Sequence, residues 1–162
     1  MMEFRRWDLP RHLRLTLRGT GHTVLAELLD DEAPTTAELV WSRLPIEATL
    51  VHAQNSGGEV FVVLDDPVRL PAENHVQLPL PGELLYFYQG TENATSGPEP
   101  IAEIAFIYGR GVTLRQAEGV PTHLNLFARV PGDWKYDWRA FADGCRASRG
   151  NPVVLRIDRE DP

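Results

Sequence analysis

The residues best suited to chemistry are a histidine and a glutamate on either side of a short turn. His52 ends one apolar stretch, Glu59 begins the next, and Gln54-Asn55-Ser56-Gly57-Gly58 between them is typical of a hairpin turn. If the two stretches pair, the two side chains lie close together across the hairpin. A histidine beside a carboxylate can act as a base, an acid or a ligand, and Gln54 is a further candidate for ligand binding. The alternative is a surface histidine that only forms hydrogen bonds beside a turn.

Two aromatic stretches, residues 81–90 and 103–109, predict a pair of neighbouring strands. Both are rich in aromatic and β-branched residues, and both end in glycine. Apolar or aromatic side chains point to both faces of each stretch, whereas a strand covered on one side alternates apolar with polar residues. We therefore expect one face to line the core and the other to lie beneath another element or to form an apolar groove.

Tyrosines of these strands are candidates to line such a groove. Tyr86 and Tyr88 share one face of the first strand, and Tyr108 lies near the end of the second. An aromatic ring with a polar tip suits a small ligand or an extended peptide, and the alternative is core packing with the hydroxyl at the edge. Glu83 opens the first strand and faces either the groove or the solvent. His123, which precedes a later strand, completes the candidates.

Motifs for metals and cofactors are missing from the sequence. The five histidines show no H-x-H or H-x-x-x-H spacing, and Cys145 is the one cysteine, so neither a metal cluster nor an intrachain disulfide is expected. No dinucleotide loop, P-loop or G-x-S-x-G occurs. We therefore expect no metal and no cofactor, and Cys145 is expected to be a small buried hydrophobe.

Composition restricts the partners and the location. A chain of 162 residues suits one domain, and its 43% of hydrophobic residues can fill a core. The net charge of −7 argues against non-specific binding to nucleic acid or to an anionic membrane, which requires clustered Lys and Arg. No apolar run is long enough to cross a bilayer, and the first residues lack the apolar middle of a signal peptide. A cytoplasmic location is expected.

About eight strands and two helices are expected to position these residues. An N-terminal arm at 1–10 precedes a single domain at 11–158. Pro34 begins one helix, which Pro45 ends, and Asp133 is suited to cap a second helix. Many short strands bounded by turns favour a closed barrel or a sandwich, and the two helices can cover its open ends. Besides the aromatic pair, strands are predicted at 11–18, 23–29, 46–53, 59–64, 125–130 and 153–157.

The order of these elements resembles the cyclophilin-like fold. Residues 28–38, with Ala33-Pro34 after an acidic run, are similar to the cyclophilin pattern in which a strand turns into the first helix. Residues 125–130 are similar to the late strand that precedes the second helix. More closely, the chain resembles small bacterial cyclophilin-like proteins of unknown function, the DUF3830 type, which is related to the TM1367-like group. The residues that carry this closer resemblance are Leu44-Pro45, His52, Ser56-Gly57-Gly58-Glu59, residues 81–88 and Tyr108-Gly109.

This resemblance implies a closed eight-stranded β-barrel with two helices. Prolyl isomerases of this fold carry a Phe-His-Arg strand, but here His52 is followed by Ala53 and no arginine. The resemblance therefore favours a protein that binds a small molecule or short peptide in a groove on the barrel. Two alternatives stay open: an enzyme that uses the same groove, as a weak peptidyl-prolyl isomerase or as a hydrolase with His52 as base, and an interaction module that buries its aromatics in a homo-oligomer.

Overall fold

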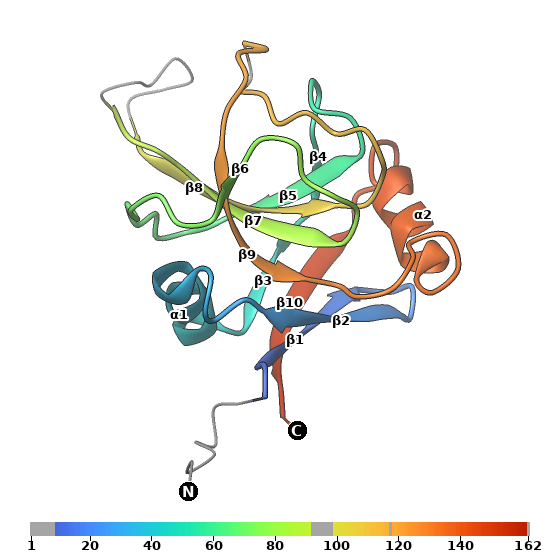
Figure 1. Cartoon of the computed structure of the whole chain (residues 1–162). Coiled ribbons are helices and arrows are strands. Elements are labelled where there is room, and N and C mark those ends of the chain that lie inside the picture. Colours follow the sequence, from blue (N-terminus) through green and yellow to red (C-terminus); the bar gives the residue numbers. More distant parts are fainter. Residues whose placement is uncertain (1–8, 92–98, 117, 162) are drawn as a thin grey trace, which may run out of the picture.

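A computed structural model describes residues 9–91, 99–116 and 118–161. Most of the predicted N-terminal arm, and most of the loop between the two aromatic strands, lie outside the described residues. The strands form one antiparallel sheet that curls around a core, with two helices packed against it (Figure 1). The elements are β1 (His12–Leu17), β2 (His22–Leu28), α1 (Pro34–Arg43), β3 (Ile46–Thr49), β4 (Val51–His52), β5 (Glu59–Val63), β6 (His75–Val76), β7 (Glu83–Gln89), β8 (Ile101–Ile107), β9 (Leu124–Arg129), α2 (Arg139–Ala147) and β10 (Val154–Glu160).

The sheet has ten strands and follows an open path, so the prediction of a closed eight-stranded barrel is not confirmed. The strand order is β3-β10-β1-β2-β9-β7-β8-β5-β4, and β6 pairs with β9. The two ends of the path, β3 and β4, are neighbours in the chain and are separated only by buried Leu50. The segment predicted as one strand at 46–53 is therefore split, because its first half pairs with β10 and its second half with β5. The sheet curls until its ends meet in one segment, without a continuous closed ladder.

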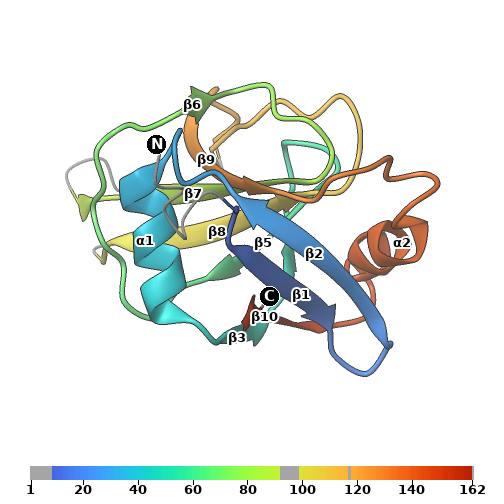
Figure 2. The ribbon, with the colours of Figure 1, turned by 60° about the horizontal axis from the view of Figure 1, so that its bottom comes forward.

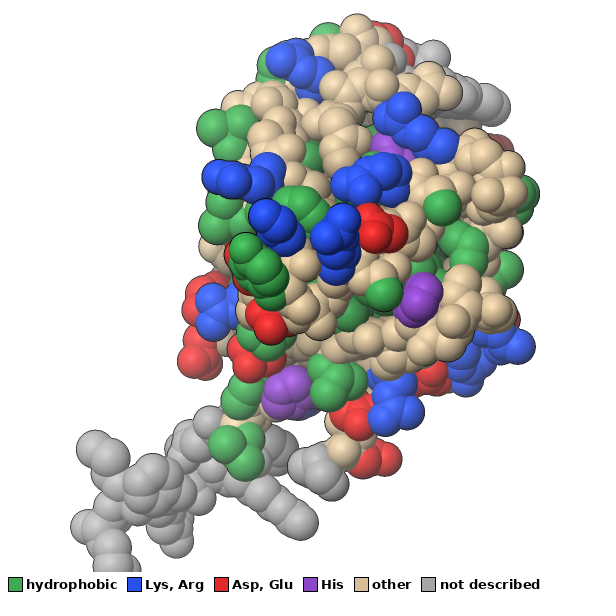
Figure 3. All heavy atoms as spheres, turned by 90° about the vertical axis from the view of Figure 1, so that its right-hand side faces the viewer, with side chains coloured by type: hydrophobic (Ala, Val, Ile, Leu, Met, Phe, Trp, Pro, Cys, Tyr) green, Lys and Arg blue, Asp and Glu red, His purple; other side chains and the backbone are tan. Residues whose placement is uncertain are grey.

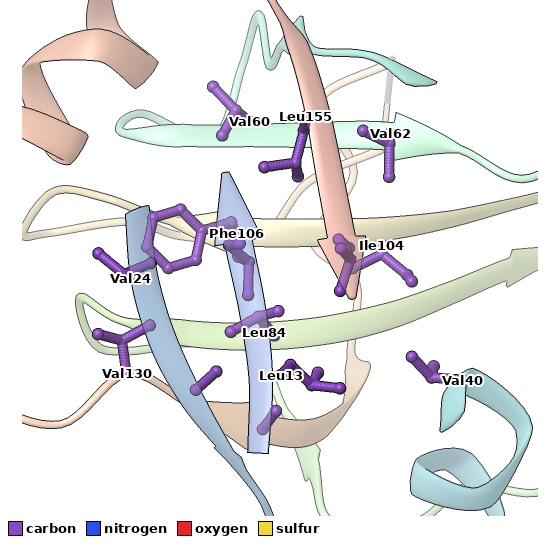
Figure 4. Close-up of a cluster of buried hydrophobic side chains, with 14 of the residues drawn as sticks. Leu13, Val24, Val40, Val60, Val62, Leu84, Ile104, Phe106, Val130 and Leu155 are labelled. Carbon is purple, nitrogen blue, oxygen red and sulfur yellow. The ribbon is translucent and has the colours of Figure 1, made fainter. Parts of the chain in front are cut away.

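The main core fills the inside of the curl. Strand residues alternate between the two faces of a sheet, so every second side chain points inward. Val60 and Val62 of β5, Leu84 of β7 and Phe106 of β8 lie there fully or almost fully buried, and Figure 4 shows them converging. Burial of each such side chain contributes about 1.5–3 kcal/mol.

The outer face of the same strands carries a second apolar cluster. Leu85 of β7 and Ile107 of β8 point outward and pack beneath a segment that follows β8. Val112 and Leu114 of that segment are buried against them. Two alternatives were open for the second face of the aromatic strands, cover by another element or an apolar groove, and here it lies beneath another element. This cover sets the position of the candidate site.

Helix α1 begins at Pro34, as predicted, but its cap comes from a distant residue. The backbone N–H groups of Thr35 and Thr36 donate to the carboxylate of Glu73 at 3.1 and 2.7 Å. A carboxylate at this position satisfies free N–H groups and interacts favourably with the helix dipole. Glu73 therefore joins α1 to the long connection before β7.

Helix α2 begins at Arg139, so the prediction that Asp133 caps it was wrong. Asp133 belongs to a separate turn: its Oδ1 accepts from the N–H of Lys135 at 2.7 Å, and its own N–H donates to Asp137 at 2.6 Å. This local turn uses the hydrogen bonds that a longer helix would need. The two helices lie on opposite sides of β1 and β2 (Figure 2).

Candidate functional site

A hollow of about 320 Å³ lies on the outer face of β5, β8 and β7, where the segment after β8 covers the sheet incompletely. We call it the outer hollow. Ligand pockets have volumes of about 300–1,000 Å³, so it has room for a small molecule. Its apolar floor comes from Phe61, Phe87, Leu114 and Leu124, and the polar residues around that floor include His52, Gln54, Ser56, Glu59, Gln89, Glu103, Arg115 and Glu118.

Glu59 is the most deeply buried charged residue of the outer hollow. It is the first residue of β5 and only 6% of it is exposed. The side chain of Ser56 forms a hydrogen bond with it, but its Oε2 has no hydrogen-bond partner among the residues that the structure describes. Burial raises the pKa of Glu59 above its usual range, because a carboxylate loses hydration there. The hollow therefore contains a polar atom that lacks a donor.

Glu103 supplies a second carboxyl on the same face. Val63 pairs with Glu103, so Glu59 and Glu103 lie four residues apart along the ladder, which is about 13 Å between their Cα atoms in the strand direction. Burial, and to a smaller extent the negative charge of Glu59, raises the pKa of Glu103 to about 7. The protonation of this carboxyl therefore changes near neutral pH.

His52 lies at the rim of the hollow and is bound by the protein on both ring nitrogens. Its Nε2 lies 2.6 Å from the hydroxyl of Tyr108, and its Nδ1 lies 2.7 Å from the carbonyl oxygen of Ala53. The Nε of Arg149 is 3.1 Å from the same Nδ1, but a protonated Nδ1 serves the carbonyl and an unprotonated one serves Arg149, so only one contact forms at a time. Burial lowers the pKa of His52, and the charge of Arg149 lowers it further.

This arrangement leaves His52 neutral and engaged. A general base must offer a free lone pair to the substrate, and in this geometry each ring nitrogen already has a protein partner. Tyr108 is 5% exposed and lies behind His52, away from the hollow. The pair therefore closes one side of the hollow.

Positive side chains gather on the other side of that pair. Arg146 of α2 lies over the ring of Tyr108, 5.5 Å from its centroid, and Arg149 follows the same helix. Figure 3 shows Lys and Arg side chains gathered on the face that carries α2. His52 and Tyr108 thus separate a basic surface from a hollow that contains the buried Glu59 and the half-buried Glu103.

Of the eight residues predicted from the sequence, the structure places three around the outer hollow: His52, Gln54 and Glu59. Tyr86 and Tyr88 lie on the opposite, inner face of β7. The hydroxyl of Tyr86 accepts from the N–H of Val68 at 3.2 Å and donates to its carbonyl. Their strand still contributes to the hollow, through Phe87 on the other face.

Glu83 and His123 also lie outside the hollow. The carboxylate of Glu83 accepts from the N–H of Leu80 at 2.7 Å, so it closes a turn ahead of β7. His123 stacks on His75, with 5.9 Å between ring centroids. Neither residue is part of the lining of the hollow, to which His52 belongs.

The residues that sequence reasoning missed are Phe61, Phe87, Glu103 and Arg115. A signal for Glu103 exists, because it is the one charged residue in the otherwise apolar strand Ile101–Ile107. Arg115 lies in a segment without periodicity, and nothing in the sequence indicates its position.

The part of the chain that the structure describes contains neither a candidate metal site nor a helix suited to span a membrane. Within residues 9–91, 99–116 and 118–161, no group of three or more His, Cys, Asp and Glu side chains could hold a metal ion. No helix in those ranges is long and apolar enough to span a membrane.

Comparison with known proteins gives one family and two similar structures. The family model described as "Protein of unknown function (DUF3830)" matches residues 15–145. The structure of McbB in complex with tryptophan has a TM-score of 0.69 at 20% identity and covers 93% of this chain, which spans 45% of McbB. The solution structure of the hypothetical protein AF2241 from Archaeoglobus fulgidus has a TM-score of 0.57 at 17% identity, covering 98% of this chain and all of that one. At these identities the likeness shows the fold alone. No curated protein matches the chain.

Proposed function

The chain belongs to the DUF3830 family, and we propose that this member binds a small molecule in the outer hollow. The observation that carries the proposal is a hollow of about 320 Å³ that combines an apolar floor with a buried carboxylate whose Oε2 lacks a partner. Small-molecule sites have this composition: mostly apolar walls and a few polar groups that fix orientation. Residues at the floor and rim, Phe61, Glu59 and His52, are assigned to ligand contact.

The size of the hollow favours a small molecule over an extended peptide. Its volume is at the lower end of the range for ligand pockets, whereas a peptide bound along a sheet needs an open strand edge or a long groove. Strands β7 and β8 are paired on both sides, and β5 pairs with β8 on one side and with the two-residue strand β4 on the other, so the floor of the hollow offers no long free strand edge.

Tryptophan is a useful first probe. It has an apolar aromatic body, which suits the floor at Phe61 and Phe87, and it is the molecule present in the McbB structure. The tryptophan complex was formed by McbB, of which this chain spans less than half. Tryptophan should therefore be tested as one member of a wider compound library.

A thermal-shift screen of metabolites with apolar bodies tests the proposal. Phe61→Ser removes the largest apolar side chain of β5 from the floor, and Val63→Ser is its matched control on the same strand and face, at a position 42% exposed and outside the hollow. We expect at least one compound to stabilise the wild type and Val63→Ser but not Phe61→Ser. Compounds that stabilise all three proteins equally would show that binding occurs elsewhere, and a screen without any stabilising compound would reject the proposed function.

A further inference from the structure

We propose that the ligand carries a protonated amine attached to an apolar body, and that Glu59 and Glu103 bind the amine in the outer hollow. This inference rests on the proposed function, since it names the class of ligand for the same site.

The first support is the incomplete hydrogen bonding of Glu59. The residue is 6% exposed and lines the hollow, yet its Oε2 has no donor within the described protein. Most buried polar atoms in folded proteins have a partner, because losing hydration without one is costly. An ammonium group supplies up to three donors and the opposite charge, and such charge-assisted hydrogen bonds are among the strongest in proteins.

The second support is the balance of charge around the hollow. The titratable side chains that line it are His52 from β4, Glu59 from β5, Glu103 from β8, and Arg115 and Glu118 from the covering segment. The guanidinium of Arg115 is exposed and donates to the carbonyl oxygen of Gly119 at 2.9 Å, so it is engaged within its own segment. Three carboxyl groups and one arginine therefore line the hollow, and of these carboxyl groups Glu59 is buried and Glu103 is half-buried. The excess of negative charge around the hollow favours a cationic ligand.

The third support is the apolar surface between the two carboxyl groups. Phe61 lies on β5 halfway between Glu59 and Val63, the residue that pairs with Glu103. Phe61 itself pairs with the small residue Ala105. A ring or alkyl chain can pack on Phe61 while its amine lies between the two carboxyl groups. Aromatic rings also attract cations over their faces, so the floor does not oppose the charge.

Three probes with the same ring and different head groups separate a cation from other ligands. They are 2-phenylethylamine, 2-phenylethanol and 3-phenylpropionate, measured by titration calorimetry on the full chain at pH 8. We expect the amine to bind at least tenfold more tightly than the alcohol, and the carboxylate to bind most weakly. In Glu59→Gln the amine should lose this advantage while the alcohol binds as before, and the exposed Glu32→Gln serves as control.

The outcomes separate this inference from the proposed function. If the alcohol or the carboxylate binds as tightly as the amine, and Phe61→Ser weakens it, the hollow binds ligands but the class is wrong. If none of the three compounds binds, the class is also wrong, and the proposed function is decided by the library screen alone.

The role of Glu103 has its own readout. A bound cation favours the ionised carboxyl, and the pKa of Glu103 lies at about 7, so amine affinity should fall about tenfold between pH 8 and pH 6. Binding at pH 7 should release a proton, which appears as a binding heat that depends on the ionisation heat of the buffer. Both effects should vanish in Glu103→Gln. His52, whose pKa is lowered, and Glu59, whose pKa is raised, face the same hollow and remain in that variant. An affinity that stays constant over this range would remove Glu103 from the site.

Discussion

Two buried polar side chains of the sheet differ in how completely their hydrogen bonds are formed. Asn125 of β9 is 4% exposed, and its amide donates to the hydroxyl of Thr36 at 3.1 Å and to the carbonyl of Pro71 at 2.9 Å. Its Oδ1 accepts from the N–H of Glu73 at 3.1 Å. Glu59 of β5 is buried to a similar degree, at 6% exposed, but its Oε2 has no partner in the described part of the chain.

The difference separates a structural cluster from a candidate binding site. The cluster of Asn125 joins α1, the long connection and β9, and each of its groups has a partner within the chain. A complete buried network makes a structure rigid and specific. An incomplete one costs stability, and proteins accept such a cost mainly where function requires it. The hydrogen bonds of the outer hollow are incomplete in this way.

The largest expected effect is the loss of the Asn125 cluster. Asn125→Leu removes three hydrogen bonds and leaves the N–H of Glu73 and the carbonyl of Pro71 without these partners. We expect the free energy of unfolding to fall by about 3 kcal/mol, since a buried group without its partner costs about 1–3 kcal/mol. Urea unfolding measures this, and Asn151→Leu, at an exposed position, should change it by less than about 0.5 kcal/mol. A loss below about 1 kcal/mol in Asn125→Leu would end the distinction between the two clusters.

Backbone packing of the turn before β5, in addition to the hydrogen bond from Ser56, is expected to hold Glu59 in position. A Cβ on Gly58 would lie 2.9 Å from the Cα of Gly109, which is too close for real atoms. Gly58→Ala therefore forces the β4–β5 turn away from the end of β8, and we expect a loss of about 2 kcal/mol in urea unfolding. Gly150→Ala, at a site with open space around it, should be nearly neutral. Equal behaviour of the two variants would show that the turn can shift freely.

The sequence predicts the strands well because alternation and turn residues are local signals. The pairing of the two aromatic strands and the start of α1 at Pro34 follow from such signals, and the structure confirms both. The break at Leu50 and the cap of α1 by Glu73 depend on contacts between distant segments, which periodicity does not record.

The candidate site was predictable only in part, for the same reason. His52 and Glu59 both line the hollow because one turn connects their strands, so their spacing is informative. The ladder pairs His52 with Val60, so the two side chains are not directly opposite each other across the hairpin. For the tyrosines of β7 the sequence leaves groove lining and core packing both open, since alternation alone does not tell which face is covered by the core, and in the structure they pack on the core face. Arg115 reaches the site through a long irregular segment, which no local pattern predicts.

A smaller effect sharpens the comparison through pH. Burial raises the pKa of Glu103 from its ordinary 4.5 to about 7, so the folded protein binds more protons than the unfolded chain between these values. Its contribution to stability is present below about pH 4.5 and is lost as the pH rises to about 7. Glu103→Gln has no carboxylate to ionise, so at pH 8 we expect it to be more stable than the wild type. The expected gain is only about 1–2 kcal/mol, because partial solvent exposure screens the carboxylate of the wild type. Unfolding at several pH values measures the difference, which should be absent in the exposed control Glu32→Gln.

The smallest expected effect has the opposite sign to that of Asn125. Glu59→Leu replaces a buried carboxylate, whose Oε2 has no partner among the described residues, with an apolar side chain next to the apolar floor at Phe61. Removing an unsatisfied buried group is neutral or stabilising, so we expect the free energy of unfolding at pH 8 to rise by about 1 kcal/mol.

The same substitution should abolish the preference of the hollow for an amine. If the variant is more stable but no longer distinguishes the ligands, Glu59 is retained for binding, because replacing a structural residue makes the protein less stable. Urea unfolding and calorimetry on one variant therefore test both halves of the comparison. If Glu59→Leu were as unstable as Asn125→Leu, the Oε2 of Glu59 would have a structural partner in solution, and the hollow would lose the group that defines it as a site.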